Sequence, residues 1–439
     1  MQRAVRVGLI GFGTIGTGVV KLLKKNRDQI CDRVGVPIEL VRIADIDTTR
    51  DRGVKLARGV LVPDARAILD DPSIDVVVEL MGGTGLARRF LLEAVAANKD
   101  VVTANKALLA HHGDEVFAAV ESAGVEIGFE ASVGGGIPII RTLRESLGGD
   151  RHDALYGIVN GTTNFILSKM SAEGRDYDEV LREAQAAGLA EADPSFDVDG
   201  IDAAHKLTLL VQLAFGCKFR LPDVSVEGIR GVTREDISYA REFGYVIKHL
   251  ATAVRHDDRV EARVHPTMVP REHPLAEING ALNAVVLESD ALATNMYVGL
   301  GAGMMPTATA VVGDLMEIAR NRLHGCRGRV APLGYPLAKQ RSARPLPAGA
   351  GEGRYYLRLR VADEPGVLAK ISGILARAKI SIASMIQREP GRRGPVTLVI
   401  QTHTAGNRAL RRAVAAIDGL DAVRGKCMVI RTEESLAPR

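Results

Sequence analysis

A glycine-rich turn near the start of the chain constrains its fold more than any other stretch. The apolar run at residues 5–10 is followed at once by the sequence GFGTIG, and residues 18–25 then have the apolar spacing of a helix. In a strand–turn–helix context, such glycines allow a tight turn and a close approach of the backbone to a pyrophosphate at the helix N-terminus. The alternative is a glycine-rich turn that serves packing alone. We predict a dinucleotide site formed by Gly11, Phe12, Gly13, Thr14, Ile15 and Gly16.

The second predicted strand, residues 38–44, ends at Asp45, where the dinucleotide fingerprint places an acid that binds ribose hydroxyls. This acid comes about thirty positions after the last glycine rather than the usual ~20, so the first helix or the loop after it must be extended. Asp45 and Asp47 favour NAD, whereas Arg50 and Arg52 just beyond them could hold the 2′-phosphate of NADP. The sequence leaves the choice of cofactor open.

Strands and helices continue to alternate up to residue 133, which predicts an α/β domain with a doubly wound parallel sheet of the Rossmann type. Such sheets bind ligands along the carboxyl ends of their strands. Gly83 and Thr84 follow one predicted strand, residues 75–80, and Lys106 follows another, residues 100–103. Lys106 also begins a predicted helix, where the dipole disfavours a cation, and a residue placed against its local preference is often functional. These three residues are candidate cofactor contacts.

The stretch from residue 188 to 210 is the strongest candidate for the catalytic part of the chain. A proline-containing loop is followed by a helix that turns apolar after Asp202 and Lys206, and the loop carries four carboxylates: Glu191, Asp193, Asp197 and Asp199. The i,i+4 spacing places Asp202 and Lys206 on one helical face. A lysine at such a position can hold a substrate carboxylate or shift its pKa and handle a proton. An ordinary surface pair is the alternative.

Three glycines at 134–136 end a further predicted strand, residues 125–133. Their backbone carbonyls, with Glu130 nearby, could surround a monovalent cation, or the segment could be a flexible crossover between domains. Further along, the exposed amides and hydroxyls of residues 160–164 could line a cleft, or Thr163 or Asn164 could simply cap a helix. A longer helix is expected at 234–253, a strand pair near 260–269 and another helix at 306–320.

Composition and charge exclude several classes of protein. The chain has 57 Lys and Arg against 53 Asp and Glu, and no basic run is interleaved with aromatics, so no nucleic-acid partner is expected. The four cysteines lack metal-ligand spacing and are typical of free thiols in a reducing compartment. No apolar run approaches the ~18 residues of a membrane span. We therefore expect a cytoplasmic protein with no membrane partner.

The C-terminal part has the pattern of a separate module. Residues 339–353 are rich in Pro, Gly and Arg without periodicity, which is typical of a semi-flexible linker. The order strand, helix, strand, strand, helix, strand over 354–432 predicts a ferredoxin-like βαββαβ fold that is a separate folding unit. We thus expect an NAD(P)-binding domain at 1–133, rejoined by part of 300–330, and an α+β substrate-binding and dimerisation domain at 134–338.

Five motifs taken together resemble homoserine dehydrogenase: GFGTIG, TANKALLA at 103–110, EASVGGGIPII at 130–140, NGTTNFIL at 160–167 and EADPSFDVDGIDAAHK at 191–206. The match covers roughly residues 1–330. The resemblance implies reversible NAD(P)-dependent interconversion of L-homoserine and L-aspartate 4-semialdehyde in the biosynthesis of threonine, methionine and isoleucine. It also implies a homodimer or homotetramer.

The same resemblance assigns roles to individual residues. Lys206 matches the catalytic lysine, and Lys106 lies between cofactor and substrate. The substrate set implied is Glu191, Asp202, Gly188 and Asp197, with Gly188 also near the cofactor and Gly303 against the nicotinamide. The family's sodium site matches Glu130, Val133, Gly135 and Ile137. Sequence does not decide which lysine carries the proton.

The C-terminal module resembles the ACT domain, an amino-acid-sensing unit, at the turn that contains Asp363, Gly366, Val367 and Leu368. This turn presents backbone amides at the start of a helix, where the carboxylate of a small amino acid could bind. Threonine is the effector that the resemblance suggests. We expect the module to regulate rather than catalyse; a module that only mediates oligomerisation is the alternative.

A second class of function stays open at this stage, namely a catalytically inactive protein that senses a nucleotide and an amino acid. Asp202 with Lys206, and Lys106, favour the enzyme, because a sensor needs no proton-handling pair. A dehydrogenase that forms acyl products would need a cysteine nucleophile, and no cysteine falls in a motif.

Overall fold

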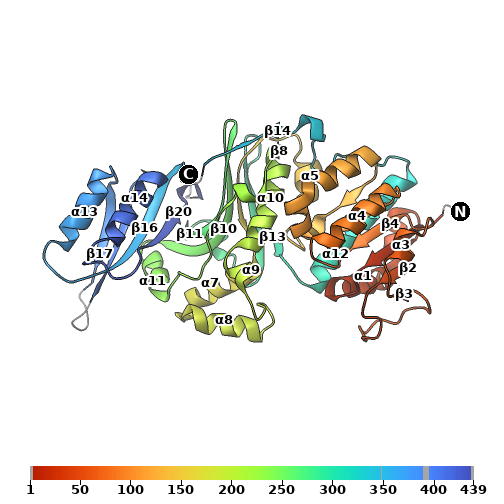
Figure 1. Ribbon diagram of the computed structural model, residues 1–439, viewed down its shortest axis with the longest axis horizontal. Helices are drawn as coiled ribbons and strands as arrows, with labels where there is room; N and C mark the ends of the chain where they lie inside the picture. Colours follow the sequence, from red (N-terminus) through yellow and green to blue (C-terminus); the bar gives the residue numbers. More distant parts are fainter. Residues whose placement is uncertain (1–2, 348, 389–394, 437–439) are drawn as a thin grey trace. The chain divides into compact units, whose positions relative to one another are not determined.

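The computed structural model describes residues 3–347, 349–388 and 395–436. These residues form two compact units (Figure 1). The first unit contains 1–159, 203–224 and 283–343, and the second contains 160–202, 225–282 and 344–439. Ala348 of the predicted linker and residues 389–394 of the predicted C-terminal module lie outside the described residues.

The first unit is built on a six-stranded parallel sheet, as the alternating pattern predicts. Its strand order is β3-β2-β1-β4-β5-β6, with β1 at Val5–Ile10, β2 at Ile38–Ala44, β3 at Leu61–Val62, β4 at Val76–Glu79, β5 at Asp100–Thr103 and β6 at Ile127–Gly128. The helices that connect these strands are α1 (Thr14–Lys25), α2 (Arg27–Val34), α3 (Arg66–Leu69), α4 (Gly85–Ala96) and α5 (Lys106–Ala123). The additional helix α2 accounts for the long spacing between the glycine turn and Asp45.

Helix α12 (Met304–Leu323) returns from late in the chain and packs against α1. A Cβ at Gly18 would lie 2.9 Å from the Met304 carbonyl oxygen, so this close approach requires glycine. Val311 and Leu315 of α12 are fully buried in one apolar cluster with residues of β1 and α1. Residues 304–323 therefore pack against the unit that contains the six-stranded sheet.

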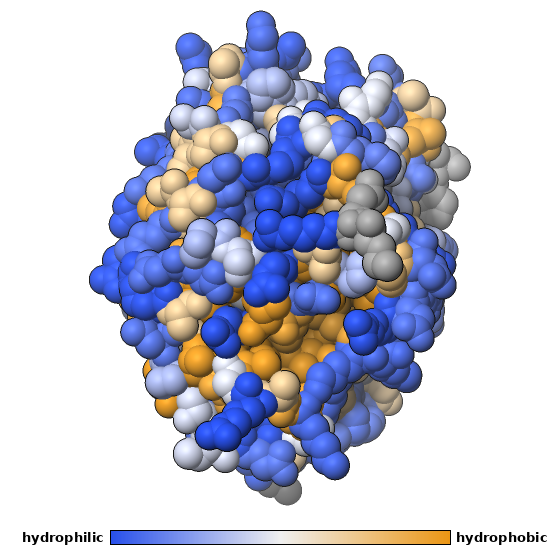
Figure 2. Space-filling model, turned by 90° about the vertical axis from the view of Figure 1, so that its right-hand side faces the viewer, coloured by the Kyte–Doolittle hydropathy of each residue, from blue (hydrophilic) through white to orange (hydrophobic). Residues whose placement is uncertain are grey.

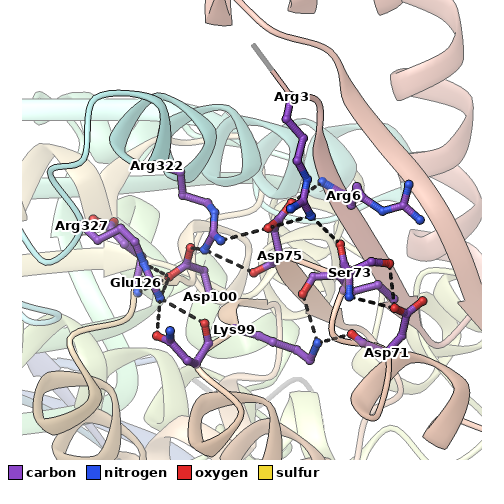
Figure 3. A network of polar contacts seen from close by, with 12 residues as sticks. Arg3, Arg6, Asp71, Ser73, Asp75, Lys99, Asp100, Glu126, Arg322 and Arg327 are labelled. Carbon is purple, nitrogen blue, oxygen red and sulfur yellow. Dashed lines mark hydrogen bonds and ion pairs between the residues drawn. The ribbon is translucent and has the colours of Figure 1, made fainter.

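A polar network fastens α12 to this sheet (Figure 3). Arg322 forms ion pairs with Asp75 at 3.0 Å and Asp100 at 2.5 Å, and Arg327 also contacts Asp100, at 2.9 Å. Asp100 is fully buried and accepts a further hydrogen bond from the Glu126 amide at 2.8 Å. These acids lie at the amino ends of β4, β5 and β6. The network thus holds the helix without occupying the carboxyl edge, where a nucleotide would bind.

The strand predicted at 125–133 is wrong for most of its length. Only Ile127–Gly128 pair with β5, and Glu130–Ser132 form a 3-10 turn. The Glu130 amide donates to the Asp314 carboxylate of α12 at 2.9 Å, and a Cβ at Gly128 would lie 2.5 Å from the Asp314 Cβ. Contact with α12 therefore replaces strand pairing in this segment.

The rest of the first unit carries a second set of strands and one long helix. The strands β7 (His152–Ile158) and β12 (Leu282–Ser289) pair antiparallel, and β13 (Ala293–Leu300) lies beside β12. The long helix is α10 (Ile201–Phe215), as the sequence predicts. Its smaller elements are α6 (Ile139–Arg141), a π-helical turn (Thr142–Ser146), β8 (Cys217–Lys218), a 3-10 turn (Leu221–Asp223), a 3-10 turn (Leu337–Lys339) and β14 (Arg341–Ser342).

Between residues 160 and 282, the second unit combines four helices with a long antiparallel hairpin. Its elements are α7 (Gly161–Glu173), α8 (Tyr177–Ala186), α9 (Ser195–Val198), β9 (Ser225–Val226), α11 (Arg234–Glu242), β10 (Tyr245–His256), β11 (Arg259–Pro270) and a 3-10 turn (Pro274–Glu277). The helix predicted at 234–253 is wrong after residue 242. Gly244 has a φ of 84°, which ends the helix, and the following residues pair with β11 along their whole length.

The C-terminal residues of the second unit have the expected βαββαβ order. They form β15 (Arg344–Pro345), β16 (Glu352–Val361), α13 (Val367–Arg377), β17 (Ile382–Gln387), β18 (Val396–Thr402), β19 (Ala405–Gly406), α14 (Asn407–Asp418), β20 (Met428–Thr432) and a 3-10 turn (Glu434–Leu436). The strand order β20-β16-β18-β17 is that of a ferredoxin-like sheet.

This C-terminal module pairs with the hairpin of the second unit. Strand β20 pairs with β11, where Thr267 lies opposite Arg431. Tyr356 of β16 is fully buried in one apolar cluster with Met268 of β11. Within the predicted linker, β14 pairs with β8 and β15 pairs with β11. Residues 341–345 are therefore part of the folded structure rather than a loose tether.

The surface is mostly hydrophilic in the view of Figure 2, with apolar side chains gathered in a hollow near the middle of that face. Among the described residues, none of the helices has both the length and the apolar character needed to cross a bilayer. Scattered apolar side chains are exposed elsewhere, and the most exposed of the large ones is Ile46, at 96%. It directly follows Asp45 at the end of β2.

Candidate active site

The glycine turn has the geometry that a dinucleotide requires. Gly11 has a φ of 99°, and a Cβ there would lie 2.6 Å from the Leu80 carbonyl. A Cβ at Gly16 would lie 2.3 Å from the Gly11 oxygen. A Cβ at Gly13, which precedes the first residue of α1, meets no atom within 4 Å. Two glycines thus permit the tight turn, and the middle one leaves open space at the helix N-terminus for a pyrophosphate.

Asp45 is bound to the glycine turn and to a nearby arginine. Its carboxylate accepts a hydrogen bond from the Phe12 amide at 2.6 Å and lies 3.3 Å from the Arg52 guanidinium. Arg52 also donates to the Phe12 carbonyl oxygen and stacks over the Phe12 ring at 4.8 Å. Arg50 is exposed on the same loop, beside a turn held by Asp47. The acid expected to read the ribose is therefore already paired with a cation.

A second network positions the two loops that follow β4 and β5. The buried Glu79 carboxylate accepts hydrogen bonds from the Thr103 hydroxyl at 2.6 Å and from the Met81 amide at 2.9 Å. Asn105 donates to the Gly83 carbonyl oxygen at 2.6 Å and caps α5 by accepting from the Leu108 amide. Burial raises the pKa of Glu79. This network places the loop that contains Gly83 and Thr84 beside the N-terminus of α5, where Lys106 is the first residue.

A third glycine-rich segment lies next to the predicted cation site. The Gly136 amide donates to the Leu300 carbonyl oxygen at 2.8 Å, and a Cβ at Gly135 would lie 2.6 Å from the Gly301 oxygen. Gly303 has a φ of 121° and immediately precedes α12. The structure thus brings the predicted nicotinamide contact and the predicted cation loop together in the first unit.

Both oxygens of the Glu130 carboxylate are already used in hydrogen bonds. It accepts hydrogen bonds from the Ile140 and Arg141 amides, both at 2.8 Å, and so caps the short helix α6. Burial and, to a smaller extent, the nearby Asp314 raise the pKa of Glu130 to about 7. Any cation bound by residues 130–137 would therefore use backbone carbonyls as its oxygen ligands.

The acid-rich loop of the second unit has three carboxylates in use and one available. Asp193 binds Ser195 at 2.6 Å, and Asp199 forms an ion pair with Arg230 at 2.5 Å. Asp197 accepts hydrogen bonds from neighbouring side chains. Glu191 is exposed, and its carboxylate makes no hydrogen bond or ion pair within the described part of the chain. It is thus the carboxylate of this loop that can bind a ligand cation.

Asn160 is the residue on which the predicted substrate acids converge. Its side-chain amide donates to Asp197 at 2.7 Å and to Asp202 at 2.9 Å. The Thr162 hydroxyl lies 3.2 Å from the other Asp197 oxygen and donates to the Leu189 carbonyl oxygen at 2.7 Å, next to Gly188. The Asn160 side-chain oxygen also caps α7, because it accepts a hydrogen bond from the Thr163 backbone amide. The prediction that Thr163 or Asn164 caps this helix is therefore wrong.

Lys206 lies one turn after Asp202 on α10, as the spacing predicts. Both side chains are buried, with 8% and 4% of their surface exposed. The Lys206 ammonium donates to the Val159 carbonyl oxygen at 2.6 Å, and Val159 immediately precedes Asn160 in the chain. A buried amine held by a neutral carbonyl at a strand end is poised to exchange a proton with a ligand.

Several site residues escape sequence reasoning. Asn160, Glu79 and Asn105 act through hydrogen bonds to residues distant in the chain, and no local pattern assigns those partners. Glu79 carried a usable signal, because a carboxylate that ends an apolar strand must find buried partners. No sequence signal marked Ile46 as exposed.

The effector turn is an exposed loop at the start of α13. Gly366 has a φ of 88° and precedes the helix, and Asp363 and Leu368 are exposed. The Val367 side chain is buried in the core of the module. The turn therefore lies at the surface and leads directly into the helix.

These features define a class of protein: an NAD(P)-dependent oxidoreductase with a Rossmann-type sheet and a C-terminal ACT domain. Three family models match the chain, described as "Homoserine dehydrogenase, NAD binding domain" over residues 11–130, "Homoserine dehydrogenase" over 138–316 and "ACT domain" over 355–421. The chain belongs to the homoserine dehydrogenase family.

Relatives of known structure and sequence match over nearly the whole chain. A homoserine dehydrogenase of Pseudomonas aeruginosa is 43% identical over 99% of this chain and 100% of its own length. The crystal structure of a homoserine dehydrogenase from Thiobacillus denitrificans has a TM-score of 0.93 and 45% identity, with 98% of each chain covered. A hyperthermophilic archaeal homoserine dehydrogenase in complex with NADPH has a TM-score of 0.61 and 25% identity over 78% of this chain and 100% of its own.

Proposed function

We propose that this homoserine dehydrogenase interconverts L-homoserine and L-aspartate 4-semialdehyde with the acid-rich loop and α10 as its substrate-binding and catalytic elements. The observation that carries the proposal is that three side chains of this segment are suited to three different tasks. Glu191 offers an unoccupied carboxylate, Asp202 is fixed by Asn160, and Lys206 is a buried amine one turn further on. Together they provide a cation-binding group and a proton-handling group for an amino alcohol.

In the proposed reaction, Glu191 binds the substrate ammonium and Asp202 holds the substrate beside Lys206. The neutral amine of Lys206 takes the alcohol proton during oxidation, and the ammonium so formed returns it to the carbonyl oxygen during reduction. When bound, the nicotinamide supplies the hydride acceptor or donor. Lys106, at the start of α5, would polarise the same oxygen or relay the proton. Both oxygens of Asp197 accept hydrogen bonds, so its proposed role in substrate binding is to position Asn160 and Thr162.

Replacing Glu191 with alanine should raise the KM for homoserine about tenfold or more, because a charged hydrogen bond to the substrate ammonium is lost. The Kd for the cofactor should be unchanged. Steady-state kinetics and a cofactor titration measure the two effects. Asp193→Ala is the matched control, since Asp193 lies on the same loop but is bound to Ser195. Equal KM values for the two variants, or loss of cofactor binding with homoserine binding intact, would contradict the assignment.

The proposed cofactors are NADP and NAD, bound at Gly11–Gly16, Asp45, Gly83, Thr84 and Gly303, with Gly188 and Lys106 at the reactive end. Arg52 offsets the charge of Asp45, which would otherwise repel a 2′-phosphate. The exposed Arg50 stands on the same loop. We therefore place the 2′-phosphate of NADP beside Arg50, while the Asp45 carboxylate keeps the ability to accept from a ribose hydroxyl of NAD.

Replacing Arg50 with alanine should weaken NADP binding about tenfold or more and leave NAD binding unchanged, because only NADP carries the 2′-phosphate. Titration of the protein with each cofactor measures the selectivity. Arg58→Ala, another exposed arginine nearby, serves as the control and should alter neither affinity. A parallel loss of NAD and NADP affinity in the Arg50 variant would assign this residue to folding of the loop instead.

A sodium ion is proposed on the carbonyls of Glu130, Val133, Gly135 and Ile137, supported by the turn that brings these residues together. Threonine is proposed as the effector at Asp363, Gly366, Val367 and Leu368, supported by the match to the ACT domain. We also propose that the protein is a homodimer or homotetramer. Four free cysteines support our proposal that it is located in the cytoplasm.

A further inference from the structure

A cavity of about 520 Å³ lies in the second unit, away from every residue assigned above. It is bordered by β11, β16, α14 and the segment that leads into β20, and Arg263, Tyr355, Asn407 and Arg431 are among its lining residues. Its volume is in the range of pockets that hold small ligands. None of the residues of the effector turn, 363–368, lines it. The cavity is therefore a separate feature from the proposed threonine site.

The lining carries an excess of positive charge. Four basic side chains border the cavity, Arg263, Arg411, Lys426 and Arg431, against two acids, Glu227 and Asp418. Lys426 lies 3.7 Å from Asp418, and Arg263 forms an ion pair with Glu261. Arg431 lies 3.9 Å from the Glu261 carboxylate and 3.8 Å from that of Glu433. Arg411 makes no ion pair among the described residues; its one hydrogen bond is to the Asn407 side chain, at 3.4 Å.

The arginines are close enough to repel one another. Burial and, to a smaller extent, the charges of Arg431 and Arg411 lower the pKa of Arg263 to about 10. Burial raises the pKa of the Tyr355 hydroxyl, and the same three arginines oppose that rise. Like charges gathered around a partly enclosed space are stabilised by a bound anion.

Several polar atoms of the lining lack partners, although buried polar groups in proteins are nearly always hydrogen-bonded. Among the described residues, no hydrogen bond of acceptable geometry is made by His265 Nε2, Asn407 Nδ2, the Tyr355 hydroxyl or Arg431 Nη1. The first three residues are at most 8% exposed. Three of these atoms are on donor groups, which suits an oxyanion.

His265, in contrast, requires a hydrogen-bond donor on the ligand. Its Nδ1 lies 3.0 Å from the Pro266 carbonyl oxygen, and burial lowers the pKa of the ring to about 3. The neutral ring donates from Nδ1 to that carbonyl, so Nε2 is an acceptor without a donor. A ligand that satisfies the whole lining needs an oxyanion at one end and a hydroxyl or ammonium group at the other.

We propose that this cavity is a binding site for a small organic anion that carries a phosphate or carboxylate group together with a hydroxyl or ammonium group. The oxyanion faces Arg411, Arg431 and the Tyr355 hydroxyl, and the donor group faces His265 Nε2. Because β11 and α14 both line the site, the ligand contacts the hairpin and the ACT domain at once and stabilises the second unit by mass action.

The test is calorimetric titration of the full chain with three probes: O-phospho-L-serine, L-malate and inorganic phosphate. The first two combine an oxyanion with a donor group and distinguish a phosphate ligand from a carboxylate ligand. Two variants accompany the wild type. Arg411→Ala removes an exposed lining arginine, and Arg412→Ala removes its exposed neighbour on α14, which does not line the cavity.

We expect O-phospho-L-serine or L-malate to bind the wild type, and to bind Arg411→Ala about tenfold more weakly or worse, as for loss of a charge-assisted hydrogen bond. Arg412→Ala should bind like the wild type. Tyr355→Phe, which keeps the charge, should also weaken binding, and the bound probe should raise the Tm of the wild type but not of Arg411→Ala. Binding of none of the probes, binding of inorganic phosphate alone, or equal affinities of the two arginine variants would overturn the proposal.

Discussion

Replacing Lys206 with alanine should lower kcat for homoserine oxidation by about 10² or more, the scale on which a lost general base slows a reaction. The Lys206 amine is buried, is held by the Val159 carbonyl, and lies one helical turn from the substrate acid Asp202. Water at the same position would be a weaker and less well-placed base. The effect should fall on kcat, with cofactor affinity unchanged.

Steady-state rates of nicotinamide reduction over a range of pH measure this effect, with circular dichroism as the check on folding. Lys169→Ala is the control, because Lys169 is a lysine of the second unit bound to Glu183 and Glu173. Lys106→Ala, measured in parallel, ranks the two lysines. In the pH profile of kcat, the rise in rate with increasing pH reports the general base losing its proton. The variant that no longer shows this rise identifies the residue that carries the proton. A folded Lys206→Ala enzyme with near wild-type kcat would remove Lys206 from the mechanism.

Replacing Asp236 with alanine should destabilise the protein by about 3–5 kcal/mol, as expected for removal of one partner from a buried ion pair. Asp236 is fully buried, and its carboxylate binds Arg358 at 2.6 and 3.0 Å and the Tyr356 hydroxyl at 3.0 Å. It also forms the capping box of α11 with Thr233. One carboxylate thus links α11 to the first strand of the ACT domain.

Denaturant unfolding of Asp236→Ala beside Glu235→Ala separates this role from a general effect of the helix terminus. Glu235 precedes Asp236 in the same turn but makes no ion pair among the described residues, so its loss should change the free energy of unfolding by about 0.5 kcal/mol or less. Equal stabilities of the two variants would show that the Asp236–Arg358 pair does not hold the ACT domain. Unfolding of the ACT domain together with α11 in one transition is the expected behaviour of the wild type.

Local patterns predicted the parts of this fold that are organised locally. The bounds of β2 and β5 and the first residue of α5 follow from the sequence, because each lies next to a clear start or stop signal. The helix predicted at 234–253 failed after Gly244, because residues 245–256 owe their strand conformation to pairing with β11. Pairing of β20 with β11 joins residues far apart in the chain, and no local signal in the linker marks it.

Some residues of the candidate site could likewise be identified from the sequence, and others could not. Motif residues such as Gly13, Glu191 and Lys206 could be chosen from the sequence, because their chemistry depends on residue type and spacing. The roles of Asn160 and Glu79 could not, since each acts through hydrogen bonds that only the folded chain creates. The cation prediction changed most, because the Glu130 carboxylate caps α6 through the amides of Ile140 and Arg141.

The central claim is that this chain catalyses the oxidation of homoserine rather than only sensing a nucleotide and an amino acid. The most direct test is the initial rate at which the absorbance of reduced nicotinamide grows when L-homoserine is added to the enzyme with NADP or with NAD. The account predicts sustained formation of reduced cofactor that depends on homoserine and is lost in Lys206→Ala. Calorimetric binding of both homoserine and cofactor without any reduced nicotinamide would contradict it.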